Sequence, residues 1–208
     1  MTFASTKQLL EKAQKQGYAV PHFNINNMEI MQGVVHAARR LKSPVILATS
    51  EGALHYAGMD FLYALAKTAA EQNKVPIALH LDHGQDIKLI KTAIHKGYSS
   101  VMIDGSHLPF EKNVAATQKV VALAHRYHVS VEAELGTIGG AEDTVRSRNI
   151  LYTNPFKAKE FVQRTGCDFL AVALGTSHGA YKFQGKATLR QDILKEISSF
   201  GKIGGVAL

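Results

Sequence analysis

Two histidines occupy positions where a protein could hold a metal ion, one in LDHG and one in GTSHG. His83 follows the apolar run IALHL and His178 follows DFLAVAL, so each lies at the end of an expected strand. Neutral imidazole suits zinc. A single histidine near a strand end is more often a hydrogen-bonded structural residue, but two at separate strand ends favour a metal site. We interpret the histidines inside expected elements as structural or surface residues, namely His36, His80, His95, His125 and His128.

The aspartate before the first of these histidines could move a proton beside the metal. Regular strand geometry would direct the consecutive side chains of Asp82 and His83 to opposite sides of the strand. Gly84 permits a turn of the backbone that would bring both to one site. A carboxylate next to a dication keeps a low pKa unless it is desolvated, so the pair is suited to metal-assisted acid–base chemistry.

Further acids follow other expected strands: Asp104 in MIDGS, Glu132 and Glu134 in VEAELG, and Glu142 and Asp143 in GGAED. Buried acids are rare unless they are paired or bind a metal. Asp104 could instead cap a loop, and Glu132 could form a salt bridge. The segment GTIGGAED is rich in glycine, and we expect a loop that could carry Glu142 into the site when substrate binds.

The elements that must position these residues alternate between strand and helix. Seven β-rich runs cover residues 18–25, 44–50, 75–83, 100–106, 129–136, 168–179 and 202–208. Segments with helical periodicity lie between them, for example at 27–41, 60–73, 110–127 and 154–166, and an amphipathic helix is expected near the N-terminus with Leu9 and Leu10 inward. The strands are nearly continuously apolar, which is typical of a parallel sheet covered on both faces.

This alternation predicts an α/β fold, either a (β/α)8 barrel or a doubly wound sheet. Polar residues follow six of the strands, at the ends where barrel enzymes build their sites, and no GxGxxG fingerprint follows the first strand. We therefore expect a TIM (β/α)8-type barrel. The chain has 208 residues and stops in its seventh strand, so the sequence predicts a single partial barrel domain over residues 1–208, incomplete at its C-terminus.

Composition restricts the kind of partner. The net charge of the chain is +7. The lysines and arginines are spread along helical segments and are not interleaved with aromatic residues, so we expect no nucleic-acid partner. No apolar run approaches the roughly 18 residues that a membrane span needs, and we expect neither a membrane anchor nor a signal peptide. The single cysteine, Cys167, is expected to be buried in a protein of the reducing cytoplasm.

Six motifs together resemble the class II, zinc-dependent fructose- and tagatose-bisphosphate aldolases. They are GYAVPHFNINN, SPVILATSEGA, LHLDHGQ, SVMIDGSHLPFEKNV, SVEAELGTIGGAED and FLAVALGTSHGAYKF, and the likeness runs in order to about residue 199. The resemblance implies reversible, zinc-dependent cleavage of fructose 1,6-bisphosphate into dihydroxyacetone phosphate and glyceraldehyde 3-phosphate. It also implies phosphorylated ketose and triose substrates and a homodimer or higher oligomer.

The resemblance assigns roles position by position. It implies that His83 and His178 are two of the three ligands of the catalytic Zn²⁺, and that Asp82 exchanges a proton with the aldehyde-side oxygen. Glu142 matches the acid that takes a proton from the carbon of dihydroxyacetone phosphate. The remaining matches are a second divalent metal position at Asp104 and Glu134, and substrate contacts at Asn24, Ser50 and Gly179.

The C-terminal residues GGVAL depart from the family pattern, in which a third zinc histidine follows. We therefore expect the 208-residue chain to be an impaired aldolase. Three alternatives are a tagatose-bisphosphate aldolase, a non-catalytic truncated remnant, and a metal-dependent hydrolase. The hydrolase reading rests on HLDH as half of an H-x-H-x-D-H motif, but Ala78 stands where that motif needs a histidine.

Overall fold

The computed structural model describes the backbone of residues 2–137, 139–142, 145–147, 151–175, 177–178, 188–200 and 206–207, and the side chains of 2–137, 151–175 and 188–200. The chain divides into two compact units. The first comprises Met1–Met102 and Leu123–Ser130, and the second comprises Ile103–Ala122 and Val131–Leu208. The single domain expected from the sequence stays a prediction.

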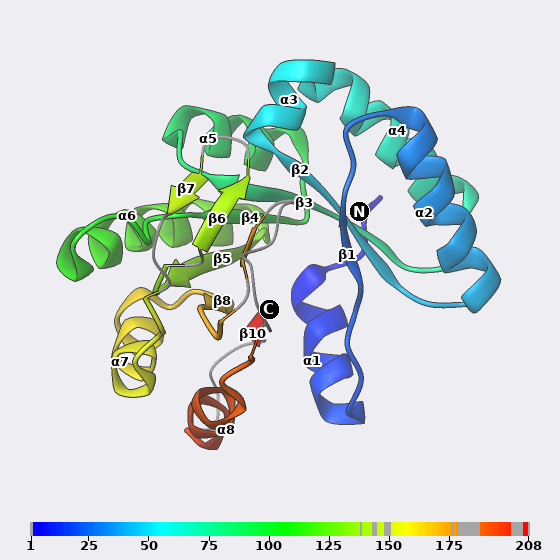
Figure 1. Ribbon diagram of the computed structural model, residues 1–208. Coiled ribbons are helices and arrows are strands. Elements are labelled where there is room, and N and C mark those ends of the chain that lie inside the picture. Colours follow the sequence, from blue (N-terminus) through cyan, green and yellow to red (C-terminus); the bar gives the residue numbers. More distant parts are fainter. Residues whose placement is uncertain are drawn as a thin grey trace. The chain divides into compact units, whose positions relative to one another are not determined.

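Parallel strands form the centre of the first unit. They are β1 (His22–Asn24), β2 (Val45–Ser50), β3 (Ile77–Gly84) and all but the last residue of β4 (Ser100–Ile103) (Figure 1). The register aligns Asn24 with Ala48 and Ala48 with His80, and it aligns Ser50 with Asp82. Every residue of β2 is buried, and so is nearly all of β3, which confirms that this part of the sheet is covered on both faces.

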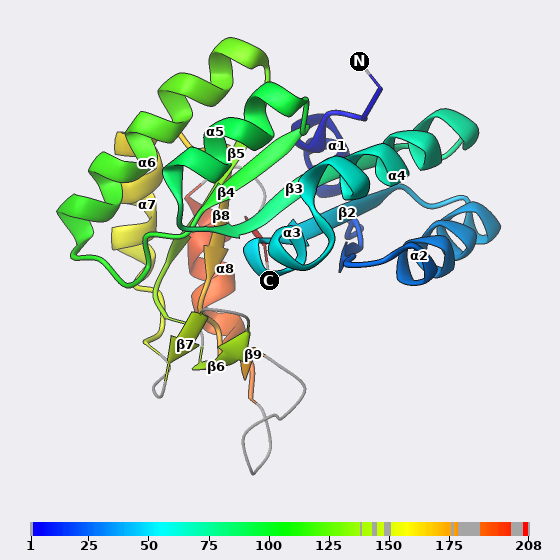
Figure 2. The ribbon, with the colours of Figure 1, turned by 90° about the horizontal axis from the view of Figure 1, so that it is seen from above.

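Helices of the first unit pack around these strands: α1 (Thr6–Gln16), α2 (Met28–Leu41), α3 (Glu51–Ala57), α4 (Met59–Gln72) and α5 (Ile87–Lys96). Helices α2 and α4 contact each other (Figure 2). Helix α2 also contacts β2, and helix α4 also contacts β3. Helix α1 contributes Leu9 to a buried cluster with Ile46 and Ala78, and Leu10 packs against this cluster while remaining partly buried. Both leucines therefore face inward, as the amphipathic pattern predicts.

The second unit contains a further parallel group of strands. Strand β5 (Ser130–Leu135), which lies in this unit apart from its first residue, pairs with β8 (Phe169–Val172), and β8 pairs with β10 (Val206–Ala207). The helices are α6 (Phe110–Ala124), mostly in this unit, α7 (Pro155–Thr165) and α8 (Gln191–Ser199), and the 3-10 helix His125–Tyr127 follows α6 in the first unit. Each of the seven segments predicted as strands thus overlaps one of the strands β1, β2, β3, β4, β5, β8 and β10.

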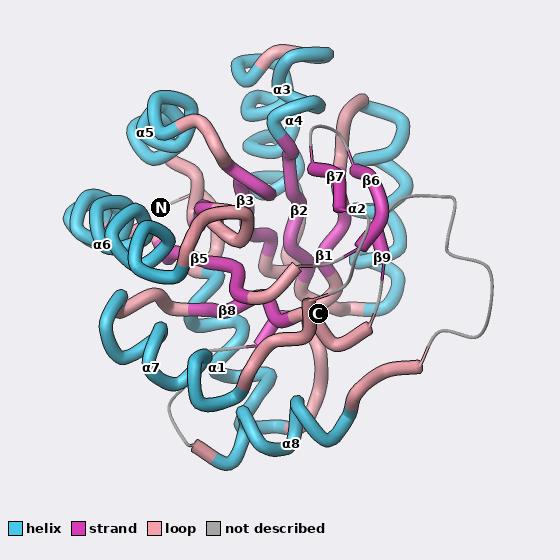
Figure 3. Tube along the Cα trace, turned by 60° about the vertical axis from the view of Figure 1, so that its left-hand side comes forward, coloured by secondary structure: helices cyan, strands magenta, loops and turns pink. Residues whose placement is uncertain are grey.

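The second unit also contains a small three-stranded sheet. Its strands are β6 (Gly139–Glu142), β7 (Val145–Ser147) and β9 (Ser177–His178) (Figure 3). Strand β6 runs antiparallel to β7 and parallel to β9. The structure therefore differs from the loop expected for GTIGGAED, because Gly139 and Gly140 in its middle pair with a segment almost 40 positions later in the chain.

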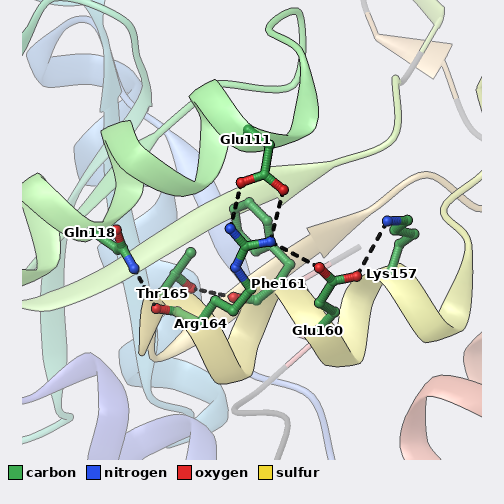
Figure 4. A network of polar contacts seen from close by, with 7 residues as sticks. All are labelled: Glu111, Gln118, Lys157, Glu160, Phe161, Arg164 and Thr165. Carbon is green, nitrogen blue, oxygen red and sulfur yellow. Dashed lines mark hydrogen bonds and ion pairs between the residues drawn. The ribbon is translucent and has the colours of Figure 1, made fainter.

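Helices α6 and α7 are joined on their exposed side by an arginine. Arg164 of α7 donates through its two terminal guanidinium nitrogens, Nη1 and Nη2, to the carboxylate of Glu111 on α6, at 2.9 and 2.5 Å, and Nη1 also donates to Glu160 at 2.9 Å (Figure 4). The bidentate geometry fixes the guanidinium plane. All three side chains are exposed, so the network orients the two helices more than it stabilises the fold.

The structure also bears on the expectations for the cysteine and for membrane spans. Cys167 is buried and free, as expected, and burial raises the pKa of its thiol to about 11. Among the described residues, no helix is both long enough and apolar enough to span a membrane.

Candidate functional site

The expected proton-transfer and metal residues of the first unit end strand β3. Asp82 is 8% exposed, and His83 follows it with a backbone φ of 47°. A positive φ is uncommon for a residue other than glycine and often marks a functional site. The turn that could bring Asp82 and His83 to one site is therefore made by His83 itself. The sequence had suggested Gly84 for this role.

Gly84 serves a different purpose, which is close packing of two strands. A Cβ atom added to it would lie 2.5 Å from the backbone oxygen of Met102 on β4 and 2.9 Å from Cγ1 of Ile90 on α5. Both distances are well below van der Waals contact. The residue after His83 must therefore lack a side chain if β3, β4 and α5 are to keep these positions.

The carboxylate of Asp82 lies among groups that favour its charged form. Asn24 donates from Nδ2 to Oδ2 of Asp82 at 2.9 Å. Burial by itself raises the pKa of this carboxyl, but the imidazoles of His83, His22 and His80 lower it, and so does the bond from Asn24. The net effect is a lowered pKa, so Asp82 is ionised at neutral pH and can accept a proton. Sequence reasoning missed His22, whose only signal is its alternation with Asn24 on one strand.

Ser50 and Glu51 arrange the backbone near Asp82. Ser50 ends β2, and its hydroxyl accepts the N–H of Ala53 at 3.2 Å as the N-cap of α3. Glu51, which sequence reasoning missed, accepts the backbone N–H groups of Gln85 and Asp86 at 2.7 and 2.8 Å. Its carboxylate thereby holds the segment that follows His83. The substrate contact expected for Ser50 stays a prediction.

The second unit brings two of the expected acids together. Asp104 and Glu134 are each at most 2% exposed, and carboxylate oxygens of the two side chains lie within 4.8 Å of each other. Asp104 accepts the backbone N–H and the hydroxyl of Ser106 at 3.0 and 2.7 Å, so it also makes the loop cap considered from the sequence. The side chain of Asn113, a further residue that the sequence did not single out, donates to the backbone oxygen of Glu134 at 2.9 Å.

This pair of acids fits a divalent cation. Two ionised carboxylates held this close in a buried place repel each other unless positive charge or a shared proton lies between them. Carboxylate oxygens are ligands that divalent cations accept readily. The donor set of the second unit is therefore suited to a metal ion.

For Glu142 and His178, the structure describes the strands in which they lie and the pairing of those strands. Glu142 ends β6 and His178 ends β9, and the register pairs Gly139 with Ser177 and Gly140 with His178. The side chains of Glu142 and His178 lie outside the described part of the chain, and so does Gly179 altogether. Their expected roles stay predictions.

Comparison with known proteins identifies sequence relatives along the whole chain. The family model of fructose-bisphosphate aldolase class-II matches residues 4–206. The chain is 48% identical to a fructose-bisphosphate aldolase of Giardia intestinalis over 209 residues and 49% identical to a probable fructose-bisphosphate aldolase of Bacillus subtilis over 211 residues. It is 52% identical over 188 residues to the D-tagatose-1,6-bisphosphate aldolase subunit GatY of Klebsiella oxytoca. The Giardia match covers all of this chain and 64% of the relative, and the Bacillus match covers all of this chain and 72% of the relative. The Klebsiella match covers 89% of this chain and 66% of the relative.

Solved structures agree with this grouping. A putative fructose-1,6-bisphosphate aldolase of Coccidioides immitis superposes with a TM-score of 0.88 at 33% identity, covering 97% of this chain and 71% of that protein. The YdjI aldolase of Escherichia coli superposes with a TM-score of 0.83 at 33% identity, covering 97% of this chain and 70% of that protein. The fold is therefore the TIM-barrel-like α/β fold of these aldolases, as the polar strand ends predict.

Proposed function

Because the chain belongs to the class II fructose-bisphosphate aldolase family, we propose that it catalyses the reversible, zinc-dependent aldol cleavage of a ketose 1,6-bisphosphate. The products are dihydroxyacetone phosphate and an aldehyde triose phosphate. The observation that carries this proposal is the match of the family model over residues 4–206.

His83 and His178 hold the catalytic zinc in this proposal. The turn at His83, the tight packing of Gly84 and the bonds from Glu51 to the next segment all support a ligand at this point of the chain. When bound, zinc supplies a Lewis acid that polarises the substrate ketone and stabilises the negative charge of the cleaved fragment. No Schiff-base lysine is then required.

Asp82 is the proton acceptor for cleavage. Its lowered pKa keeps the carboxylate ionised, so it can take the proton of the substrate hydroxyl whose carbon becomes the aldehyde. The same group returns that proton in the condensation direction. The bond from Asn24 restricts one carboxylate oxygen and leaves the other for this transfer. Asn24 thus supports the reaction through Asp82 as well as through the substrate contact expected from the sequence.

Glu142 handles the second proton, on the carbon of dihydroxyacetone phosphate. During cleavage it donates a proton to that carbon, and during condensation it removes one. The parallel pairing of β6 with β9 supports this role, because it joins the strand of Glu142 to the strand of His178. Asp104 and Glu134 bind a second, non-catalytic divalent cation, which is supported by their burial and proximity.

Fructose 1,6-bisphosphate is the first candidate substrate, with Ser50 on the glyceraldehyde phosphate side and Gly179 on the dihydroxyacetone phosphate side. Tagatose 1,6-bisphosphate is the second candidate, and the 52% identity to the GatY subunit favours it. The two sugars differ at one hydroxyl-bearing carbon. Measured kcat/KM on both sugars decides between them, and a clear preference for tagatose bisphosphate would reverse the order.

A homodimer or higher oligomer, testable by light scattering, is proposed from the family.

The test compares two variants of one chain, so it does not depend on the absolute rate. Triose phosphate release from fructose 1,6-bisphosphate is measured by a coupled assay, with added zinc and after chelation, for the unaltered protein and for His83→Ala. We expect zinc-dependent release that His83→Ala abolishes, because loss of a ligand removes the catalytic zinc. Equal release by both proteins, or release that chelation does not change, would refute the proposal.

A further inference from the structure

The face of the sheet that carries Asp82 contains polar residues in the layer preceding it. Alternation along the strands places His80 and Asp82 on the same face. The register puts Asn24, Ala48 and His80 in one layer across β1, β2 and β3. Barrel interiors are usually filled by branched apolar side chains. Here a layer next to the proton acceptor contains a buried imidazole, and buried polar groups need partners.

A chain of hydroxyl groups provides those partners for His80. Its Nδ1 lies 2.8 Å from Oγ of Ser100, and that oxygen lies 2.8 Å from Oγ1 of Thr6, the first residue of α1. Thr6 in turn lies 3.2 Å from Oγ of Ser99. The Ser99 hydroxyl donates to the backbone oxygen of Leu79 at 3.0 Å and accepts its N–H at 2.9 Å. The chain therefore ends on the backbone of the residue before His80.

Counting protons along this chain fixes its direction. Each hydroxyl has one proton to donate, and Ser99 uses its proton on Leu79. Thr6 must then donate to Ser99, so Ser100 must donate to Thr6. With the proton of Ser100 already used, His80 is left to donate from Nδ1. A neutral His80 therefore carries its proton on Nδ1.

The neutral form of His80 is favoured at neutral pH. Burial, together with the neighbouring His22, lowers the pKa of His80 to about 3. The ring of His22 meets that of His80 edge to face, with centroids 5.3 Å apart. Orientation and tautomer are thus set by contacts on two sides of the ring.

We propose that His80 is a positioning residue for Asp82, held in a single tautomer by the Ser100–Thr6–Ser99 hydroxyl chain that passes through the first residue of helix α1. The inference rests on the proposed function, because it gives His80 a role in the reaction through Asp82. The strand carries His80 two residues before Asp82, and Asn24, which binds the Asp82 carboxylate, shares the layer of His80. The imidazole of His80 and the carboxylate of Asp82 also interact electrostatically, so the fixed orientation of the ring acts on the carboxylate.

The tautomer is measured first, on the zinc-loaded protein labelled with nitrogen-15. Long-range proton–nitrogen correlation distinguishes the two tautomers of a neutral histidine, and the signal of His80 is identified by its loss in His80→Gln. We expect a proton on Nδ1 in the unaltered protein. A proton on Nε2 would overturn the proposal, and this measurement needs neither a variant of the hydroxyl chain nor any activity.

A matched pair of variants at Thr6 then tests the effect on the reaction. Thr6→Val keeps the shape of the side chain but removes its hydroxyl, whereas Thr6→Ser keeps the hydroxyl. In Thr6→Val, the proton of Ser100 loses its acceptor and turns toward His80, so the tautomer should switch to Nε2–H. We expect kcat to fall roughly twofold to tenfold in Thr6→Val, as for the loss of one neutral hydrogen bond, with KM and zinc content unchanged. Thr6→Ser should retain both the tautomer and kcat.

The outcomes separate this inference from the proposed function. If the unaltered protein shows no zinc-dependent cleavage, the proposed function fails while the tautomer still reports on the hydroxyl chain. If cleavage is present and Thr6→Val matches Thr6→Ser in tautomer and kcat, the positioning role is refuted and the proposed function stands.

Discussion

Gly84→Ala is expected to destabilise the protein because no space exists for a methyl group next to His83. The added Cβ would lie 2.5 Å from the Met102 backbone oxygen, and 2.9 and 3.2 Å from two carbons of Ile90. Contact normally begins near about 3.5 Å, so the overlap with the oxygen is about 1 Å. A backbone oxygen in a strand cannot rotate away, and β3 must move from β4. Overpacking of this kind lowers the free energy of unfolding by about 1 to 3 kcal/mol.

Gly33→Ala is the matched control for this substitution. Gly33 lies inside helix α2, and a Cβ there would meet no atom within 4 Å. Alanine in a helix interior is favoured over glycine by about 0.5 to 1 kcal/mol, so this variant should be more stable than the unaltered protein. Urea unfolding of the three proteins, followed by circular dichroism, gives the comparison. Equal unfolding midpoints for Gly84→Ala and the unaltered protein would refute the packing argument.

Three further predictions concern single side chains. Asn24→Ala removes the donor to Asp82 and should lower kcat/KM for aldol cleavage by about tenfold to 100-fold without changing zinc content, whereas unchanged kinetics would argue against the role of this bond. Asn113→Ala removes the buried donor to the Glu134 backbone and should lower the free energy of unfolding by about 1 to 3 kcal/mol in urea; no measurable loss would contradict it. Cys167, with its pKa raised to about 11, should react with a thiol reagent at neutral pH only after denaturation, so rapid reaction of the native protein would show that the thiol is accessible.

Local patterns predicted the strands and most helices because their cause is local. The runs at 44–50 and 75–83 are nearly continuously apolar up to their polar C-terminal ends, and β2 and β3 are buried along nearly their whole length. Helix α7 begins after Asn154, which accepts the N–H of Lys157, and it ends at Gly166 in a left-handed conformation. The sequence 154–166 contains both signals, so its boundaries could be predicted closely.

Features that depend on distant residues could not be predicted in this way. Strand β6 forms by pairing with β9, and no pattern within GTIGGAED indicates that partner. The contact between Thr6 and Ser100 joins residues 94 positions apart. The positive φ of His83 is also invisible in the sequence, because strand alternation assumes a regular backbone and the left-handed turn is held by the surrounding packing.

The most direct test of the account is to measure zinc content and aldol cleavage on the same preparations of Asp82→Ala and His83→Ala. The two residues are neighbours, but the account gives them different roles: Asp82 accepts a proton, and His83 binds the metal. We predict that Asp82→Ala retains zinc while cleavage slows on the order of 100-fold or more, as for a lost acid–base group, and that His83→Ala loses both. Normal turnover by Asp82→Ala, or full zinc binding by His83→Ala, would contradict the account.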